Sequence, residues 1–429
     1  MGSGLALLHL TANHSSYRRR VKRRGLRRAH YTLPPADEIE AVGTTEERRT
    51  DYTYDSRFFG KATSITEPLV FAGSSKVTTT TYVDYGNPLT ETVSGFTPDG
   101  TPVTRTVTRE YNGPLHQLSK VDGPRTDVAD ITLHEYHPDD PAEGDDRARL
   151  KRVIGPDGVL ERASMKYTAT GKLRAENRPN DLRIRYKYYD GSDRLSNVIE
   201  IDDLTGEERT THFTYTATGE VQSISTGWGT PDETTLTFHY DDARYLLRVK
   251  DALDNVIRFK LDTEGNLYER RIVDPAGTLH SKLQQTFDLY NRLNASTLEN
   301  ESRDYDYAPD GTLNRVIDGN GTTTAYDYDA LKRLLAGTRN LGGSDPATGD
   351  SVTAYDYDAG DRLTRVTDAK GNRTTYVYDD LGNPLSQSSP DTGTTTYSHD
   401  EAGNLTQMTD AKGQVFVHSY DIAGRLSGI

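Results

Sequence analysis

The sequence predicts an all-β fold in which β-hairpin repeats of about 21 residues follow one another in tandem and form a spiralling, curled sheet. Three observations predict it. An Asp follows a recurring aromatic phrase at Asp358, Asp379, Asp400 and Asp421, a constant step of 21. Hydrophobic residues make up only 33% of the chain, and 27 of its aromatic residues are Tyr. No stretch of comparable length has helical periodicity. A repeat of this period indicates an array of one supersecondary unit, and the Tyr-rich composition favours a wall one sheet thick over a thick apolar core.

The first strand of each unit carries the aromatic phrase, written Tyr-x-Tyr in its clearest copies. Because successive side chains of a strand point to opposite faces, the two Tyr share one face. We expect their rings to stack on neighbouring repeats as cross-strand pairs, each contributing about 0.2–1 kcal/mol. The members are Tyr326 and Tyr328, Tyr355 and Tyr357, Tyr376 and Tyr378, Tyr397, and Tyr420.

A tight turn follows this strand, with Asp at its first position and Gly at its fourth. That order is typical of a type I turn. The carboxylate can accept from the backbone N–H groups ahead of it, and Gly tolerates the positive φ at which the next strand begins. The second strand of each unit runs into a similar turn. The predicted structural turn residues are Asp329, Asp358, Asp379 with Gly382, Asp400 with Gly403, Asp421 with Gly424, Asp368 with Gly371, and Asp410 with Gly413.

Upstream the pattern weakens but continues, so residues 37–429 are predicted to be one array of about fifteen units. The repeats are clearest over 238–429, and loops such as 138–146 and 342–349 interrupt the array. The chain stops partway through a unit at Ile429. We therefore expect it to be a truncated array.

Residues 1–36 are predicted to be a separate, disordered basic tail. They contain eight Arg and Lys residues and no acid, so the remainder carries −22 of a chain whose net charge is −14. Such a run can bind nucleic acid or anionic lipid, but a solvated tail, or sequence upstream of the true start, is the favoured interpretation. The short apolar stretch precedes the arginines, which is the wrong order for a secretory signal. No apolar run approaches the roughly 18–20 residues that cross a bilayer.

The sequence predicts no catalytic residue, no metal site and no cofactor. Cys is absent, which excludes disulfides, zinc–thiolate sites and thiol nucleophiles. The Asp-Tyr-Asp triplets at 304–306, 327–329 and 356–358 look like a metal-binding Asp-x-Asp pair, but their recurrence favours turn-capping. Repeated Asp and Gly turns also occur in calcium-binding β-helices, yet here each Asp is expected to hold its own backbone. His134 and His137 are three residues apart on a strand and so face opposite ways.

The phrases at 376–383 and 419–426 resemble the Tyr-x-Tyr-Asp-x-x-Gly-Arg-Leu repeat of the Rhs, or YD-repeat, family, and the resemblance covers roughly residues 50–429. It implies a β-sheet spiral that closes into a hollow cocoon, as in bacterial Rhs proteins, toxin-complex C components and teneurins. In bacterial members the shell encloses a C-terminal toxin. The resemblance further implies a secreted or cell-surface protein. The chain departs from the pattern by ending without a plug segment or cargo.

Three functional hypotheses follow. The first is a non-enzymatic shell segment whose partner is a polypeptide cargo, such as a toxin domain, or further repeats downstream. The second is a surface adhesin that binds glycans through exposed Tyr, with Trp228 as a further candidate contact. The third is a non-functional remnant, prone to aggregate through unpaired strand edges. Nucleic acid is not an expected partner.

Overall fold

A computed structural model describes residues 35–45, 47–68, 75–340 and 349–429. The predicted tail lies outside the described residues except for Pro35 and Ala36. The predicted loop 342–349 lies outside them except for Gly349.

The described chain consists of 34 β-strands and one short 3₁₀ helix. The strands are β1 (Asp37–Glu40), β2 (Arg48–Tyr54), β3 (Ala62–Glu67), β4 (Lys76–Tyr82), β5 (Pro88–Phe96), β6 (Pro102–Glu110), β7 (Lys120–Asp122), β8 (Ile131–Tyr136), β9 (Leu150–Ile154), β10 (Leu160–Tyr167), β11 (Leu173–Arg178), β12 (Leu182–Tyr188), β13 (Leu195–Asp202), β14 (Glu208–Tyr215), β15 (Val221–Thr226), β16 (Thr234–Tyr240), β17 (Leu246–Lys250), β18 (Val256–Leu261), β19 (Leu267–Val273), β20 (Leu279–Phe287), β21 (Leu293–Leu298), β22 (Glu301–Tyr307), β23 (Leu313–Asp318), β24 (Thr323–Tyr328), β25 (Leu334–Arg339), β26 (Ser351–Tyr357), β27 (Leu363–Thr367), β28 (Arg373–Tyr378), β29 (Pro384–Ser389), β30 (Gly393–His399), β31 (Leu405–Thr409), β32 (Val415–Val417), β33 (Ser419–Tyr420) and β34 (Leu426–Gly428).

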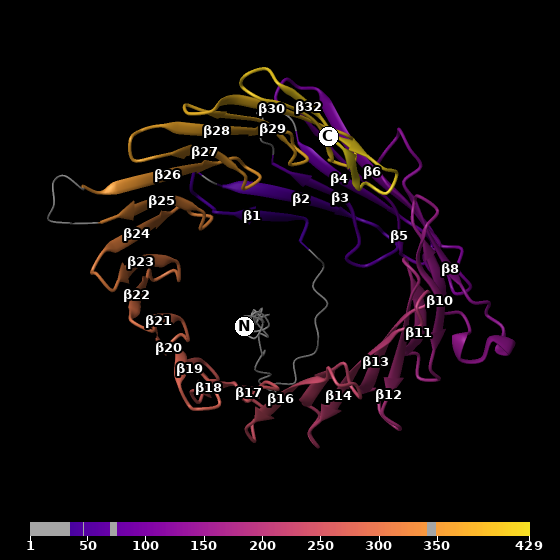
Figure 1. The fold of residues 1–429 in the computed structure, drawn as a ribbon. Helices are drawn as coiled ribbons and strands as arrows, with labels where there is room; N and C mark the ends of the chain where they lie inside the picture. Colours follow the sequence, from indigo (N-terminus) through magenta and orange to yellow (C-terminus); the bar gives the residue numbers. More distant parts are fainter. Residues whose placement is uncertain (1–34, 46, 69–74, 341–348) are drawn as a thin grey trace, which may run out of the picture. The chain divides into compact units, whose positions relative to one another are not determined.

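The sheet is a continuous meander. Each strand from β1 to β31 pairs antiparallel with the strand that follows it, and β33 and β34 form a separate hairpin. Figure 1 shows the strands following a curved path that brings β28–β32 beside β2–β6. Within the described residues, β1 and β32 pair only with their chain neighbours, so the sheet is not closed. The predicted all-β array of tandem hairpins in a curled sheet is confirmed.

The wall is a single sheet with little apolar core, as the composition predicted. Among the described residues the buried hydrophobic side chains are Ala148, Val153, Met165, Ile184, Ile199, Ile201 and Val256. Most other hydrophobic side chains are half-buried, because successive side chains of a strand point to opposite faces of the sheet. In β24, for example, Tyr326 and Tyr328 are half-buried and Asp327 between them is exposed. Stability must therefore come mainly from the strand ladders and from the contacts at the turns.

The predicted insertion 138–146 is ordered by polar contacts. It contains the 3₁₀ helix η1 (Pro141–Asp146), and the Asp140 carboxylate caps it by accepting from the N–H of Ala142. Asp146, buried at its end, accepts from the Lys166 ammonium and from the backbone N–H of Tyr167, each at 2.8 Å. The insertion thus packs onto β10. No helix within the described ranges is long and apolar enough to span a membrane.

Candidate functional site: the repeat turns and the seam between early and late strands

The turn after β28 shows how the signature residues are used. The carbonyl of Asp379 accepts from the N–H of Gly382 at 3.1 Å, and the N–H of Asp379 donates to the carbonyl of Asn383 at 3.0 Å. The carboxylate of Asp379 accepts from the backbone N–H of Asn383 at 2.8 Å and from its side-chain amide at 2.7 Å. Gly382 has φ 95°, a conformation that favours glycine. Both carboxylate oxygens therefore hold the turn itself.

The other signature turns repeat this arrangement. The carboxylates of Asp329, Asp358, Asp368, Asp400, Asp410 and Asp421 each accept from the backbone N–H groups two and four residues ahead. Gly371, Gly403, Gly413 and Gly424 all have positive φ. Where Arg replaces Asn four residues after the Asp, as in Arg333, its guanidinium donates to the second carboxylate oxygen, that of Asp329, at 2.6 Å.

These hydrogen bonds favour the ionised carboxylates. The backbone N–H and guanidinium of Arg425 lower the pKa of Asp421, and the Asn372 amide lowers that of Asp368. Burial raises the pKa of Asp329, but the hydrogen bonds from Arg333 outweigh it and the net shift is downward. The carboxylates of Asp421, Asp368 and Asp329 are thus ionised at neutral pH and contribute to holding their hairpins in register.

In three late repeats the ring of the second Tyr packs beneath an arginine of the preceding hairpin, and at Tyr307 the hydroxyl also bonds that hairpin. Tyr307 donates to the carbonyl of Leu293 at 2.9 Å, and the Arg292 guanidinium lies 4.5 Å from its ring centroid. Arg333 over Tyr357 and Arg362 over Tyr378 repeat the cation–π contact at 5.1 and 5.2 Å. The Arg-Leu end of one phrase therefore forms the docking site for the Tyr of the next.

The predicted cross-strand stacks of Tyr rings are wrong for the clearest repeats. Within the described residues, paired Tyr rings occur at 52 and 54, 85 and 111, and 189 and 215, and none involves the signature Tyr from Tyr326 to Tyr420. Successive phrases lie on alternate strands, so about 9–10 Å separates them in the sheet. Ring pairs need centroids about 4.5–7 Å apart. In three of the late repeats an arginine side chain occupies the space between the Tyr rings of successive phrases.

Late turns contact early strands along what we call the seam, defined as the contacts of residues 358–361, 379–382, 400–403 and 421–425 with residues 48–157. At its centre, Asp380 and Phe96 form two hydrogen bonds. The N–H of Asp380 donates to the carbonyl of Phe96 at 2.9 Å, and the N–H of Phe96 donates to the Asp380 carboxylate at 2.7 Å. A Cβ at Gly95 would lie 2.4 Å from the Cβ of Asp380, so the approach requires glycine at that position.

Each successive repeat turn adds a contact of its own. Arg48 in β2 donates to the carbonyl of Ala359 at 3.1 Å and pairs with Asp361 at 2.8 Å. Further contacts are Arg105 to the Glu401 carbonyl at 3.0 Å, Thr126 to the Glu401 carboxylate at 2.8 Å, Arg125 to the Asp400 carboxylate at 3.6 Å and to the Asp421 carbonyl at 2.8 Å, and Arg425 to Asp157 at 2.6 Å. The 21-residue period of the sequence thus becomes a row of evenly repeated contacts.

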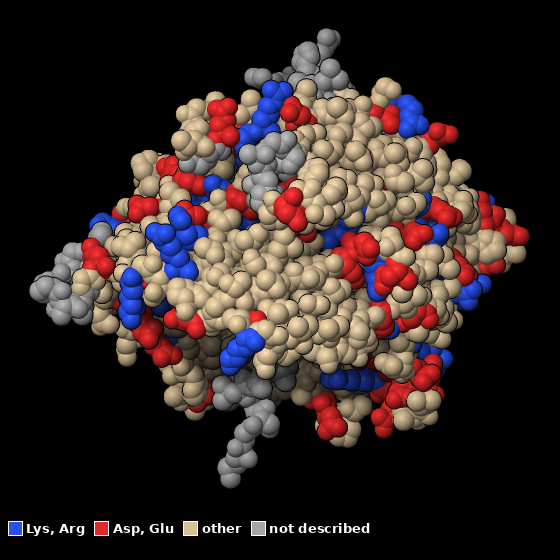
Figure 2. All heavy atoms as spheres, turned by 90° about the horizontal axis from the view of Figure 1, so that it is seen from above, with Lys and Arg blue, Asp and Glu red and all other residues tan. Residues whose placement is uncertain are grey.

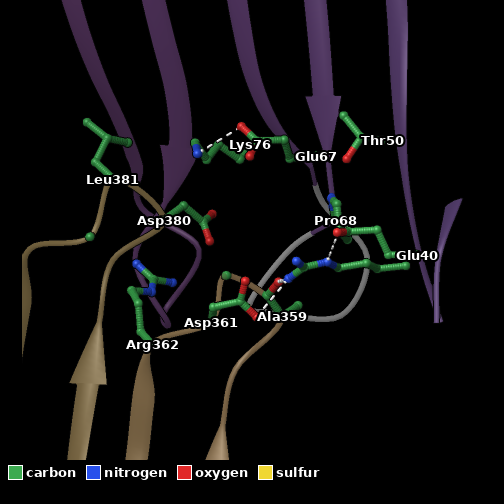
Figure 3. A pocket seen from close by; sticks show the side chains of 13 residues that line it. Glu40, Thr50, Glu67, Pro68, Lys76, Ala359, Asp361, Arg362, Asp380 and Leu381 are labelled. Carbon is green, nitrogen blue, oxygen red and sulfur yellow. Dashed lines mark hydrogen bonds and ion pairs between the residues drawn. The ribbon is translucent and has the colours of Figure 1, made fainter. Parts of the chain in front are cut away.

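A cavity of about 340 Å³ opens at the seam beside β2 and β4 (Figure 3). Arg48 lies between Glu40 and Asp361, and Lys76 pairs with Glu67 at 2.8 Å. Oδ1 of Asp380, in the cavity wall, is buried and has no hydrogen-bond partner among the described residues. The basic side chains that line the cavity are already paired with carboxylates. We therefore read these ion pairs as contacts that hold the early and late strands together. Within the described ranges, no three His, Asp or Glu side chains gather as a metal site.

The glycan candidate Trp228 lies in the turn after β15 and is 46% exposed. Its ring stacks on His212 of β14, with centroids 4.6 Å apart and planes inclined by 21°. One ring face is therefore occupied by the protein itself.

The fold and the turns define a repeat protein that builds a curved β-wall, and the comparisons name its class. Residues 357–394, 378–415 and 399–429 match the RHS Repeat family, so the C-terminal part of the chain consists of RHS repeats. A crystal structure of TcdB2-TccC3 shares its fold at 16% identity and a TM-score of 0.58, over 90% of this chain. TcdB2-TccC3 without its hypervariable C-terminal region gives the same identity, coverage and score. The Tc holotoxin pore of Photorhabdus luminescens matches at 15% identity and 0.58, over 89% of this chain.

This chain spans only 22–23% of the length of those structures. No curated protein matches it in sequence. At such identity the likeness establishes the fold, and the roles of the larger assemblies are not transferred with it.

The early partners in the seam were missed from the sequence. Gly95, Arg48, Arg105 and Arg125 lie where the repeat is weakest, and no local pattern marks them. The late partners were visible only as ordinary turn residues.

Proposed function

We propose that this chain is a non-enzymatic segment of an Rhs-type shell that encloses a polypeptide cargo, such as a toxin domain. The observation that carries the proposal is the seam. By binding late turns to early strands, it converts a one-sheet ribbon into a wall with successive windings in contact. Turns whose polar groups are used internally leave few flexible loops for a protease to enter. A secreted or cell-surface location belongs to the same proposal.

The alternative of glycan binding through Tyr has less support. The signature Tyr are half-buried, and the rings of Tyr357 and Tyr378 lie beneath the guanidinium groups of Arg333 and Arg362. In the part of the chain that the structure describes, the Tyr rings more than 70% exposed are limited to Tyr290, which lies beneath the Arg292 guanidinium at 5.0 Å. A sugar platform needs accessible ring faces.

Protease protection tests the enclosure. A small, unstructured reporter peptide is joined after Ile429, and its survival under trypsin is followed by mass spectrometry beside that of the same peptide added free. We expect at least tenfold slower cleavage when it is joined to the chain. The same fusion carrying Asp380→Ala, which opens the seam, should lose most of that protection. Cleavage of the joined and free peptides at equal rates would contradict enclosure by this chain.

A further inference from the structure

A row of basic side chains crosses five neighbouring strands on one face of the sheet. The strand register places His239 of β16 opposite Arg248 of β17, and Arg248 opposite Arg258 of β18. Arg258 is in turn opposite Arg271 of β19, and Arg271 is opposite Lys282 of β20. Because residues directly opposite in a sheet lie on the same face, these five side chains form one line, which we call the basic row. It extends over about 19 Å, given a strand spacing of about 4.8 Å.

The acids on this face do not balance the basic row. Lys250 and Lys260 flank it, which makes six Arg and Lys side chains together with Arg248, Arg258, Arg271 and Lys282. Glu269 is shared among Lys260, Arg271 and Lys282 at 3.0, 2.9 and 4.0 Å, and Asp254 pairs with Lys250. Within the described residues, Arg248 and Arg258 have no acidic partner. In the described residues, the carboxylates paired with these six cations are those of Glu269 and Asp254, in a chain whose net charge is −14.

The pKa values of two residues on this face, His239 and Glu269, are lowered beside the basic row. Burial lowers the pKa of His239, and the charges of Arg248 and Lys250 lower it further. The ring is neutral at pH 7, and its Nε2 accepts from the Arg248 guanidinium at 2.6 Å. Glu269, almost completely buried, has its pKa lowered by hydrogen bonds from Arg271 and Lys260.

The later hairpins that the structure describes do not place bases opposite one another in this way. On the corresponding face of two later hairpins an acid stands opposite a base: Asp306 opposite Arg315, and Asp356 opposite Arg365. On the face seen in Figure 2, basic and acidic side chains are intermixed around a broad area of other residues. Like charges directly opposite one another destabilise a sheet. The four cations of the basic row therefore lower the stability of the sheet through mutual repulsion, and an anionic partner would offset this repulsion.

We propose that the basic row is a docking site for an acidic, carboxylate-rich polypeptide segment. This goes beyond enclosure, since it assigns a surface and a partner chemistry that the wall alone does not require. Three of its residues are Arg, whose planar guanidinium matches a carboxylate in a bidentate pair. The row is accessible: Arg258 is exposed, and the side chains of Arg271 and Lys282 are 43% and 31% exposed.

Charge alone would also suit a nucleic acid, but this face offers no stacking platform. The aromatic residues of these strands, such as Phe238 and Phe259, occupy alternate positions and so lie on the opposite face. Binding of single-stranded nucleic acid relies on aromatic rings for bases as well as cations for phosphates. Glu269 in the middle of the surface would further repel a phosphate backbone.

The test is the binding of fluorescein-labelled octaglutamate to the full chain, followed by anisotropy at low ionic strength, with octaglutamine as the uncharged probe. We expect octaglutamate alone to bind, and added salt to weaken it. The triple variant Arg248→Gln, Arg258→Gln, Arg271→Gln should bind at least tenfold more weakly. The control Arg174→Gln, Arg373→Gln, Lys412→Gln makes the same change of charge at exposed positions elsewhere and should bind as the parent does.

Failure of octaglutamate to bind the parent chain, or equal losses in the triple variant and the control, would overturn the proposal. Tighter binding of an oligothymidylate of equal charge through the same arginines would overturn the polypeptide assignment. The triple variant removes repulsion but also the pairing of Arg271 with buried Glu269, so its thermal midpoint is measured to show that it folds. If it fails to fold, Arg258→Gln alone, at an exposed position, should still weaken octaglutamate severalfold. Enclosure is measured separately by the reporter peptide, so either proposal can fail alone.

Discussion

The substitution Gly95→Ala should open the seam at its centre. The new Cβ would lie 2.4 Å from the Cβ of Asp380, an atom fixed by its own backbone, so one of the two segments must move. Moving them breaks the bonds between Phe96 and Asp380, at 2.9 and 2.7 Å. A neutral hydrogen bond contributes about 1 kcal/mol and one to a charged group about 1.5–3 kcal/mol. We therefore expect local opening to become easier by about 2–4 kcal/mol.

Native-state hydrogen exchange measures this directly. An opening easier by about 2 kcal/mol corresponds to roughly 30-fold faster exchange, and it should be confined to β5 and to the turn between β28 and β29. The control is Gly337→Ala in β25, where the new Cβ would meet only a Tyr326 ring carbon at 4.0 Å. If Gly95→Ala and Gly337→Ala exchange alike at Phe96 and Asp380, the close approach at the seam is refuted.

Three further changes probe the repeat itself. Arg333→Gln removes the guanidinium that holds Asp329 at 2.6 Å, so exchange in that turn should accelerate by roughly tenfold, or about 1–2 kcal/mol. Tyr307→Phe removes the donor to the Leu293 carbonyl and should cost about 1 kcal/mol, seen as a lower thermal midpoint. The lowered pKa of Asp421 means that its stabilisation is present above the unfolded value of about 3.9 and is lost as pH falls through the folded value. Circular dichroism should therefore show the C-terminal hairpin melting below about pH 4.

Matched variants accompany these tests. Tyr290→Phe, at a ring that is 79% exposed, should leave the thermal midpoint unchanged. Arg373→Gln, at an exposed position of β28, should leave turn exchange unchanged. Equal effects of control and test variants would show that the changes act through general charge or hydrophobicity. An Asp421→Asn variant that melts in acid as the parent does would separate the acid transition from that carboxylate.

The repeat could be predicted from sequence because its information is local. Asp379 and Gly382 form their turn within five residues, so spacing alone indicates the hydrogen bonds. The packing of Tyr could not be predicted in the same way. The distance between phrases depends on the intervening strand, and that distance places Arg292 rather than another Tyr against Tyr307.

The seam and the basic row depend on geometry that no local pattern encodes. Gly95 meets Asp380 across 285 residues of chain, and its role depends on the curvature accumulated over the strands between them. Arg248, Arg258 and Arg271 are separated by unequal intervals, because each turn and bulge shifts the register between strands. Only the observed pairings show that they stand in line.

Nearest-neighbour pairing throughout the meander has a kinetic consequence. Each hairpin closes a short loop, so it can form as soon as its own residues are available, without waiting for distant partners. Joining Phe96 to Asp380 instead closes a loop of nearly three hundred residues. That junction should be the last to form and the first to separate, so the molecule would uncurl from its overlapping ends while its individual hairpins remain intact.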